Sequence, residues 1–265
     1  MDKARLGAFA EHACVAGSLV AHKPRSLDFA QAAAVPLAGL TALQVLRDEL
    51  RVAAGQRIFI PGGAGGVGTF AIQLARRFGA DVTTTASPRG KDLVTRLGAT
   101  RVVDYTAPFP TDLPKHDGAF DLVAGDALGH CFDVAKRGGR VVTIAGIPEP
   151  RTATQDLKRG FPLAARFWLA SFPVRVRAWS RGVDYRYYFM RPDGKGLAEL
   201  AAWIDAGELD VIIDRVFPFS HIGEAFAHLE SGRAKGKVVV TFGASASHDD
   251  ANHSPAALAR AALLG

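Results

Sequence analysis

The stretch from Arg57 to Ala80, RIFIPGGAGGVGTFAIQLARRFGA, decides the fold of this chain. It opens with the apolar run Ile58-Phe59-Ile60, turns through a glycine-rich segment, and continues with apolar residues at helical spacing. This order predicts a strand, a tight turn and a helix, which together form one unit of a βαβ pattern.

The turn in this stretch carries its chemistry. Gly63, Gly65 and Gly68 are spaced as G-x-G-x-x-G. In this motif the first glycine permits the tight turn, the second lets the backbone approach a pyrophosphate, and the third lets the helix pack on the strand. The amino end of the helix adds unpaired N–H groups and the positive end of its dipole. The turn therefore predicts a dinucleotide-binding site.

Two rival patterns share these glycines and fail on other residues. A Walker A loop needs a lysine after its last glycine, whereas Gly68 is followed by Thr69 and Phe70. The short-chain dehydrogenase spacing also fits, but that class uses a Tyr-x-x-x-Lys pair. No tyrosine of this sequence has a lysine four residues later, so that interpretation lacks its acid–base group.

The residues after the next predicted strand, Asp81–Thr85, indicate which dinucleotide binds. A site for NAD usually places a carboxylate at the carboxyl end of this strand, where it holds the ribose 2′-OH. Here that end carries Ser87, Arg89 and Lys91. A hydroxyl and two cations suit a 2′-phosphate, so the sequence predicts NADP(H) rather than NAD(H). The alternative is that the two cations only begin a solvated helix.

Length and composition narrow the class of protein. The chain has 265 residues, a formal net charge of +6 and no apolar run of transmembrane length, which predicts a soluble globular protein. The first residues lack the apolar core of a signal peptide, and two cysteines, Cys14 and Cys131, fit a reducing compartment. We therefore predict a cytoplasmic location. Each cysteine is expected to be a buried small residue, and neither has partners at the spacing of a zinc site.

Strand and helix patterns alternate along the rest of the chain, which predicts an α/β fold with a doubly wound parallel sheet. Strands are expected at 102–103, 120–124, 140–145 and 237–242, with strand-like pieces at 9–15 and 18–21. Helices are expected at 29–35 with Asp28 as N-cap, and at 37–50, 91–97, 127–135, 194–205 and 222–229, the last capped by Ser220. Ligands of such sheets lie outside the carboxyl ends of the strands.

Residues 151–191 combine arginines with aromatic side chains. Such a segment can stack on single-stranded nucleic acid or lie on a membrane surface. The interpretation that we favour is a helix packed by its aromatic side, with arginine head groups in solvent, that forms a lid or a subunit contact. We therefore expect neither a nucleic acid nor a membrane as a partner.

Three further blocks flank the glycine-rich unit in the sequence. One precedes it, AAAVPLAGLTA at 32–42, and two follow it, FDLV at 120–123 and VFPFSHIGEAFAHLESGRAKGKVVVTF at 216–242. In order and spacing the sequence resembles the zinc-independent quinone oxidoreductase (zeta-crystallin-like) branch of the medium-chain dehydrogenase/reductases. The resemblance implies a Rossmann domain, NADPH as hydride donor, and a quinone, an enone or a similar activated double bond or carbonyl as acceptor. It also implies a homodimer, or in some members a tetramer, and no metal.

The resemblance further implies which residues contact the cofactor. These are Gly63, Gly65, Gly66, Val67 and Gly68 at the pyrophosphate, Ser87, Arg89 and Lys91 at the 2′-phosphate, Tyr105 near the adenine ribose, Thr41, Ala145, Gly146 and Ile147 near the nicotinamide, and Lys237 near the phosphates. No catalytic residue is assigned, and Asp126 is only a weak candidate for a proton donor.

Members of this branch begin with a GroES-like catalytic domain, and most of that domain has no counterpart here. The resemblance implies a remnant of it at 1–35, an NADP-binding Rossmann domain at 36–213, a return segment of the catalytic domain at 214–243 and a mobile tail at 244–265. Two other functions therefore stay open beside reduction. One is an NADP-binding protein without turnover, acting as a sensor or a partner-binding fragment, and the other is RNA binding through residues 161–191.

Overall fold

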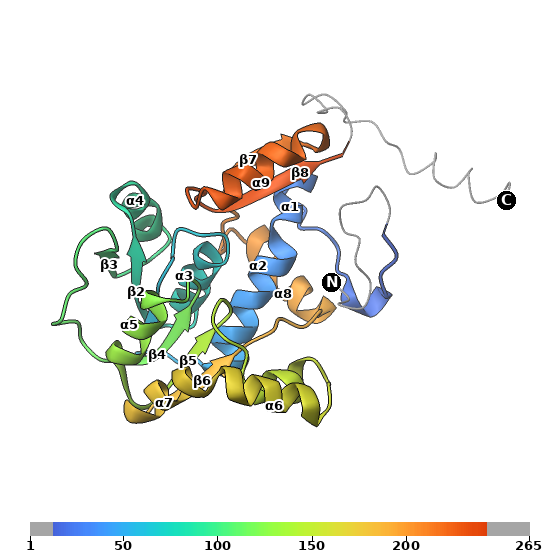
Figure 1. The fold of residues 1–265 in the computed structure, drawn as a ribbon. Helices are drawn as coiled ribbons and strands as arrows, with labels where there is room; N and C mark the ends of the chain where they lie inside the picture. Colours follow the sequence, from blue (N-terminus) through green and yellow to red (C-terminus); the bar gives the residue numbers. More distant parts are fainter. Residues whose placement is uncertain (1–12, 243–265) are drawn as a thin grey trace, which may run out of the picture.

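The computed structural model describes residues 13–242, and their centre is a six-stranded parallel sheet (Figure 1). Its strands lie in the order β3-β2-β1-β4-β5-β6, which is the order of dinucleotide-binding folds and confirms the predicted doubly wound sheet. The strands are β1 (Arg57–Ile60), β2 (Asp81–Ala86), β3 (Arg101–Asp104), β4 (His116–Asp121), β5 (Ala135–Thr143) and β6 (Asp184–Tyr187). The strand order reverses between β1 and β4, and the glycine-rich turn follows β1 at this point.

Helices cover both faces of the sheet (Figure 1). The helices of the described chain are α1 (Phe29–Ala33), α2 (Val35–Gln44), α3 (Gly68–Arg77), α4 (Pro88–Arg96), α5 (Asp126–Val134), α6 (Phe161–Ala170), α7 (Phe172–Ser180), α8 (Gly194–Asp205) and α9 (Ile222–Glu230), of which α9 packs on the separate strands β7 and β8. Asp28 caps α1 as predicted, because its carboxylate accepts from the Gln31 amide at 2.7 Å. Within residues 13–242, no helix is both long and apolar enough to cross a membrane.

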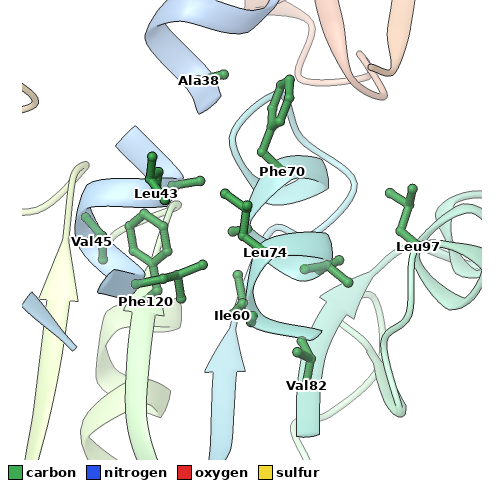
Figure 2. Close-up of a cluster of buried hydrophobic side chains, with 14 of the residues drawn as sticks. Ala38, Leu43, Val45, Ile60, Phe70, Leu74, Val82, Leu97 and Phe120 are labelled. Atoms are coloured by element: carbon green, nitrogen blue, oxygen red, sulfur yellow. The ribbon is translucent and has the colours of Figure 1, made fainter. Parts of the chain in front are cut away.

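Alternate residues of β1 enter two separate hydrophobic clusters. Ile58 and Ile60 pack with residues of α2, α3 and α8 on one face, and Figure 2 shows Ile60 of this cluster beside Leu74. Phe59 packs on the other face with residues of α5 and α7. All three side chains are at most 1% exposed, as expected for a central parallel strand that helices cover on both faces.

The end of the described chain forms a small βαβ unit of its own. Strand β7 (Ile213–Pro218), helix α9 and strand β8 (Lys237–Thr241) make a two-stranded parallel sheet. The unit joins the main sheet at the glycine-rich turn, where Gly236 forms a parallel bridge with Gly65 and its amide donates to the Ala64 carbonyl at 2.9 Å.

Two strand ends differ from the sequence-based boundaries. Strand β4 runs from His116 to Asp121 rather than over 120–124, because Ala124 and Gly125 have φ of 70° and 56° and cannot extend a strand. Strand β5 begins at Ala135 and ends at Thr143, two residues before the predicted end.

The structure of the arginine-rich and aromatic segment, residues 151–191, differs more from the prediction. It forms α6, α7 and the unpredicted strand β6 instead of one helix, and the predicted lid or subunit contact through its aromatic side stays a prediction. Phe161 and Trp179 are 82% and 81% exposed, whereas Tyr185 and Tyr188 around β6 are buried.

Three smaller expectations also fail. Residues 17–19 form a 3₁₀ turn where a strand was expected at 18–21. The Ser220 hydroxyl bonds to the His221 ring and does not cap α9. Cys14 is exposed, although Cys131 is buried as predicted. The expected strand at 9–15 and the tail at 244–265 lie partly or wholly outside the described residues.

Candidate cofactor site

The glycine-rich turn packs so closely that side chains are excluded at two of its motif positions. A Cβ at Gly63 would lie 2.1 Å from the Thr84 hydroxyl, and one at Gly68 would lie 2.3 Å from the Gly62 carbonyl. A Cβ at Gly65 would meet only the Gly62 carbonyl, at 3.3 Å. The first and third motif glycines therefore serve the turn and its packing, while the surface at the second is open to a ligand, as the motif predicts.

A lysine from the C-terminal unit lies over this turn. A Cβ at Gly66 would come within 2.7 Å of Lys237 Cδ. The lysine is half-buried, burial lowers the pKa of its ammonium group, and none of the carboxylates within residues 13–242 forms an ion pair with it. A desolvated cation without a counter-ion, beside backbone N–H groups at a helix start, suits a bound anion. The residues present therefore fit the pyrophosphate of a dinucleotide.

The predicted 2′-phosphate residues lie at the start of α4, next to the turn. A Cβ at Gly90 would be 3.2 Å from the Ala64 Cβ, which places this end of α4 against the glycine-rich turn. Ser87 is the N-cap residue, yet its hydroxyl makes no capping bond to α4. Arg89 and Lys91 are exposed, and the Arg89 carbonyl accepts from Lys235 Nζ at 2.6 Å. Lys235 thus adds a third cation that no sequence pattern indicates, since only the folded chain brings the segment before β8 beside α4.

Two further residues that are predicted to contact the cofactor differ in their exposure to solvent. Tyr105 follows β3 and is 62% exposed at the carboxyl edge of the sheet. Thr41 is buried in α2, where its hydroxyl donates to the Leu37 carbonyl at 2.6 Å. The contact between Thr41 and a nicotinamide ring stays a prediction.

The predicted nicotinamide segment, Ala145–Ile147, follows β5 at the same edge. The Ala145 and Ile147 side chains are exposed, whereas the backbone of the segment is hydrogen-bonded to Thr143 and Tyr185. Neither of those two residues was singled out from the sequence, because a threonine or a tyrosine in a strand gives no local sign of what its hydroxyl holds. Asp126, the weak proton-donor candidate, is exposed at the start of α5.

The part of the chain that the structure describes contains no group of three or more His, Cys, Asp or Glu side chains placed to hold a metal ion. Cys131 lies in the core, and burial raises the pKa of its thiol well above the ordinary value. A thiol in such an environment is a packing residue rather than a ligand or a nucleophile.

Comparisons with known proteins give relatives along most of the chain. Residues 97–240 match the model of a family described as zinc-binding dehydrogenases. The mitochondrial NAD(P)H oxidoreductase RTN4IP1 of Danio rerio is 36% identical over 246 residues, which are 89% of this chain and 62% of that protein. The chloroplastic NADPH-dependent alkenal/one oxidoreductase of Arabidopsis thaliana is 37% identical over 245 residues, 89% of this chain and 53% of that protein.

One solved structure is similar to this chain in both fold and sequence. The quinone oxidoreductase from Coxiella burnetii superposes with a TM-score of 0.70 at 30% sequence identity, over 83% of this chain and 62% of that one. The chain thus spans between half and two thirds of the length of the curated relatives that it matches.

Proposed function

Because the chain belongs to the medium-chain dehydrogenase/reductases, in their zinc-independent quinone oxidoreductase branch, we propose that it is an NADPH-dependent reductase of quinones, enones or similar activated double bonds or carbonyls. The observation that carries the proposal is the Lys237 ammonium without a counter-ion over the glycine-rich turn. The name of the Arabidopsis relative, an alkenal/one oxidoreductase, supports an acceptor with an activated double bond.

When bound, NADPH supplies a hydride from C4 of its nicotinamide, so the chain itself has only to bind, orient and exclude water. The backbone of residues 63–68 holds the pyrophosphate, and Lys237 neutralises its charge. Ser87, Arg89 and Lys91 hold the 2′-phosphate, and Ala145–Ile147 line the nicotinamide. The proton that completes the reduction comes from solvent or a hydroxyl group.

The preference for NADPH over NADH is part of this proposal. Its support is the pair of exposed cations at the start of α4, Arg89 and Lys91, with a third cation, the Lys235 ammonium, bound to the Arg89 carbonyl. Cations recognise a 2′-phosphate and gain nothing from a 2′-hydroxyl. We also propose a homodimer, as the family resemblance implies. A cytoplasmic location stays a prediction, and the two relatives named above are mitochondrial and chloroplastic.

The first test is a titration of the purified chain with NADPH and with NADH, followed by nicotinamide fluorescence. We expect saturable NADPH binding and weaker NADH binding. Oxidation of NADPH is then measured with benzoquinone and methyl vinyl ketone as acceptors. Binding without turnover on either acceptor would favour the NADP-binding sensor instead, and binding of neither dinucleotide would contradict the cofactor site.

Lys237→Met tests the observation that carries the proposal. The change keeps the length of the side chain and removes its charge, so we expect NADPH affinity to fall by about tenfold or more, the scale of a charge-assisted contact. Lys195→Met is the matched control, because Lys195 is exposed on α8. Equal affinities for the two variants would mean that Lys237 does not bind the phosphates.

A further inference from the structure

A buried carboxylate lies where β4 ends, one strand away from the predicted nicotinamide segment. Asp121 is fully buried, and its carboxylate accepts from the Thr143 hydroxyl at 2.6 Å. It also accepts from the amides of Val123 at 3.1 Å and Ala124 at 3.0 Å. These bonds satisfy a charge that would otherwise be costly to bury, so the arrangement has a fixed geometry.

The hydrogen bond to Asp121 fixes the direction of the Thr143 hydroxyl. Because its one proton is donated to the carboxylate, the oxygen can only accept from its other neighbours. Those neighbours are the amides of Ala145 at 3.2 Å and Gly146 at 2.9 Å. The carboxylate on β4 therefore sets the backbone of the segment that follows β5.

A second hydroxyl holds the other end of that segment. Tyr185 of β6 donates its hydroxyl hydrogen to the Ile147 carbonyl at 2.7 Å. Burial raises the pKa of this phenol, so it stays a donor throughout the physiological pH range. Only glycine fits between the Thr143 and Tyr185 side chains, since a Cβ at Gly146 would lie 2.9 Å from both the Tyr185 hydroxyl and Thr143 Cγ2.

The same carboxylate also sets the loop after β4. Ala124 has φ of 70°, a conformation that is unfavourable for a residue with a Cβ, and the Asp121 carboxylate accepts its amide hydrogen. In this loop the Val123 side chain lies against the turn, because a Cβ at Gly62 would be 2.8 Å from Val123 Cγ2. The Asp121 carboxylate thus orders two pieces of backbone. One is the loop beside the glycine-rich turn, and the other is the predicted nicotinamide segment, Ala145–Ile147.

We propose that Asp121, Thr143 and Tyr185 are positioning residues that fix the Ala145–Ile147 wall and thereby set the orientation of the nicotinamide for hydride transfer. The inference rests on the proposed function and adds to it three residues that touch neither the phosphates nor the acceptor. They control the rate of transfer from bound cofactor, while the affinity for the dinucleotide comes from the turn, from Lys237 and from the start of α4.

Thr143→Val tests the inference, because it removes the hydroxyl and keeps the shape of the side chain. We expect its Kd for NADPH to stay within about threefold of wild type, while kcat falls about tenfold or more, as the loss of two or three buried hydrogen bonds implies. The fluorescence of bound nicotinamide, which reports how firmly the ring is held, falls toward that of free NADPH. Thr143→Ser restores the hydroxyl and is expected to recover at least half of kcat.

The control variant is Thr100→Val, which loses one hydroxyl bond, to the Val82 carbonyl at 2.9 Å, before β3 and away from the carboxyl edge. It is expected to leave kcat and the fluorescence unchanged. Tyr185→Phe removes a single oxygen and is expected to behave like Thr143→Val, which keeps the test decisive if that variant does not fold.

Three results separate the possible failures. Wild-type kcat and nicotinamide fluorescence in both Thr143→Val and Tyr185→Phe would overturn the positioning role while leaving the reductase intact. A parallel loss of NADPH affinity and kcat, without recovery in Thr143→Ser, would show a merely structural role and also overturn it. Wild-type protein that binds no NADPH would overturn the proposed function itself, and the inference with it.

Discussion

His116 is a titratable side chain enclosed in the sheet. It is fully buried, its Nε2 lies 2.9 Å from the Thr83 hydroxyl, and its ring packs on Phe59. Burial, with a smaller contribution from Arg57, lowers its pKa from 6.5 to about 4. The unfolded chain therefore takes up a proton below pH 6.5 that the folded chain resists until about pH 4.

The consequence for stability has a definite sign. The contribution of His116 is complete above pH 6.5 and is lost as the pH falls toward 4, by roughly 3 kcal/mol. Urea unfolding at a series of pH values should show this loss in the wild type and a shallower one in His116→Gln. His221→Gln, at an exposed histidine, should keep the wild-type slope. Parallel slopes for wild type and His116→Gln would contradict the shifted pKa.

At the residue scale, the sequence predicts local chemistry better than chemistry that depends on contacts across the fold. The excluded Cβ positions at Gly63 and Gly68 agree with the roles that their motif spacing predicts. Asp121 and Thr143 could not be found in this way, because their hydrogen bonds join two strands that are 22 residues apart in sequence. In the sequence, each of the two appears only as a polar residue between apolar ones.

At the scale of elements, β6 and the turn at Thr152–Asp156 are held together by a buried arginine. Arg186 of β6 is 2% exposed, and its guanidinium lies 2.7 Å from the Asp156 carboxylate and 3.0 Å from that of Glu149. This explains why β6 was missed: an arginine within a strand suggests exposure, and its carboxylate partners lie 30 and 37 residues earlier. Strand β1, by contrast, was predicted because Ile58, Phe59 and Ile60 are apolar.

Removing the charge of Arg186 should destabilise the fold strongly. Arg186→Met removes the ion-pair partner of the buried Asp156 carboxylate and leaves the buried Glu149 carboxylate with Arg151 alone, so we expect the free energy of unfolding to fall by about 3–5 kcal/mol. Arg47→Met is the matched control, because Arg47 pairs with Asp48 and Glu199 on the surface and should cost less than about 1 kcal/mol. Denaturant unfolding measures both, and equal losses would mean that the Arg186 network contributes no more than a surface pair.

At the scale of the whole molecule, the proposed homodimer has a candidate contact surface on α6 and α7. The exposed apolar side chains there are Phe161, Trp168, Leu169, Phe172, Val176 and Trp179. Side chains already occupy the outer edge of β6 beside them, because the Tyr185 carbonyl accepts from Arg151 and the Tyr187 carbonyl accepts from Thr152. A second copy would therefore contact side chains rather than extend the sheet.

This surface allows a specific prediction about the dimer. Residues 158–181 carry six cations, Lys158, Arg159, Arg166, Arg175, Arg177 and Arg181, and no carboxylate. Arg177 and Arg181 pair with Asp133 of α5, but the surface keeps an excess of positive charge, so two copies in contact should repel until salt screens them. Light scattering should give twice the chain mass of 28.1 kDa, with tighter association at higher salt. Trp179→Ser should weaken the dimer and Phe29→Ser, at an exposed residue of α1, should not. A monomeric wild type at all salt concentrations would contradict the proposal.

The doubly wound class of the sheet could be predicted from sequence through five of its six strands, β1 to β5, because alternating patterns and a glycine-rich turn specify it locally. No local pattern places the β7–α9–β8 unit, since its position depends on the contacts of Gly236 and Lys237 with a turn more than 160 residues earlier, and only the family resemblance put Lys237 near the phosphates. The division of the chain into domains at 35, 213 and 243 stays a prediction.

The bridge between Gly236 and Gly65 has a consequence for how long the protein survives in a cell. The proposed dinucleotide site spans the turn and Lys237 at the start of β8, so a ligand held there would also oppose separation of the C-terminal unit. A ligand at a hundred times its Kd adds about 2.7 kcal/mol to the cost of any opening that destroys its site. We therefore expect that unit to open more often when the dinucleotide is scarce, and proteases to cleave the protein faster.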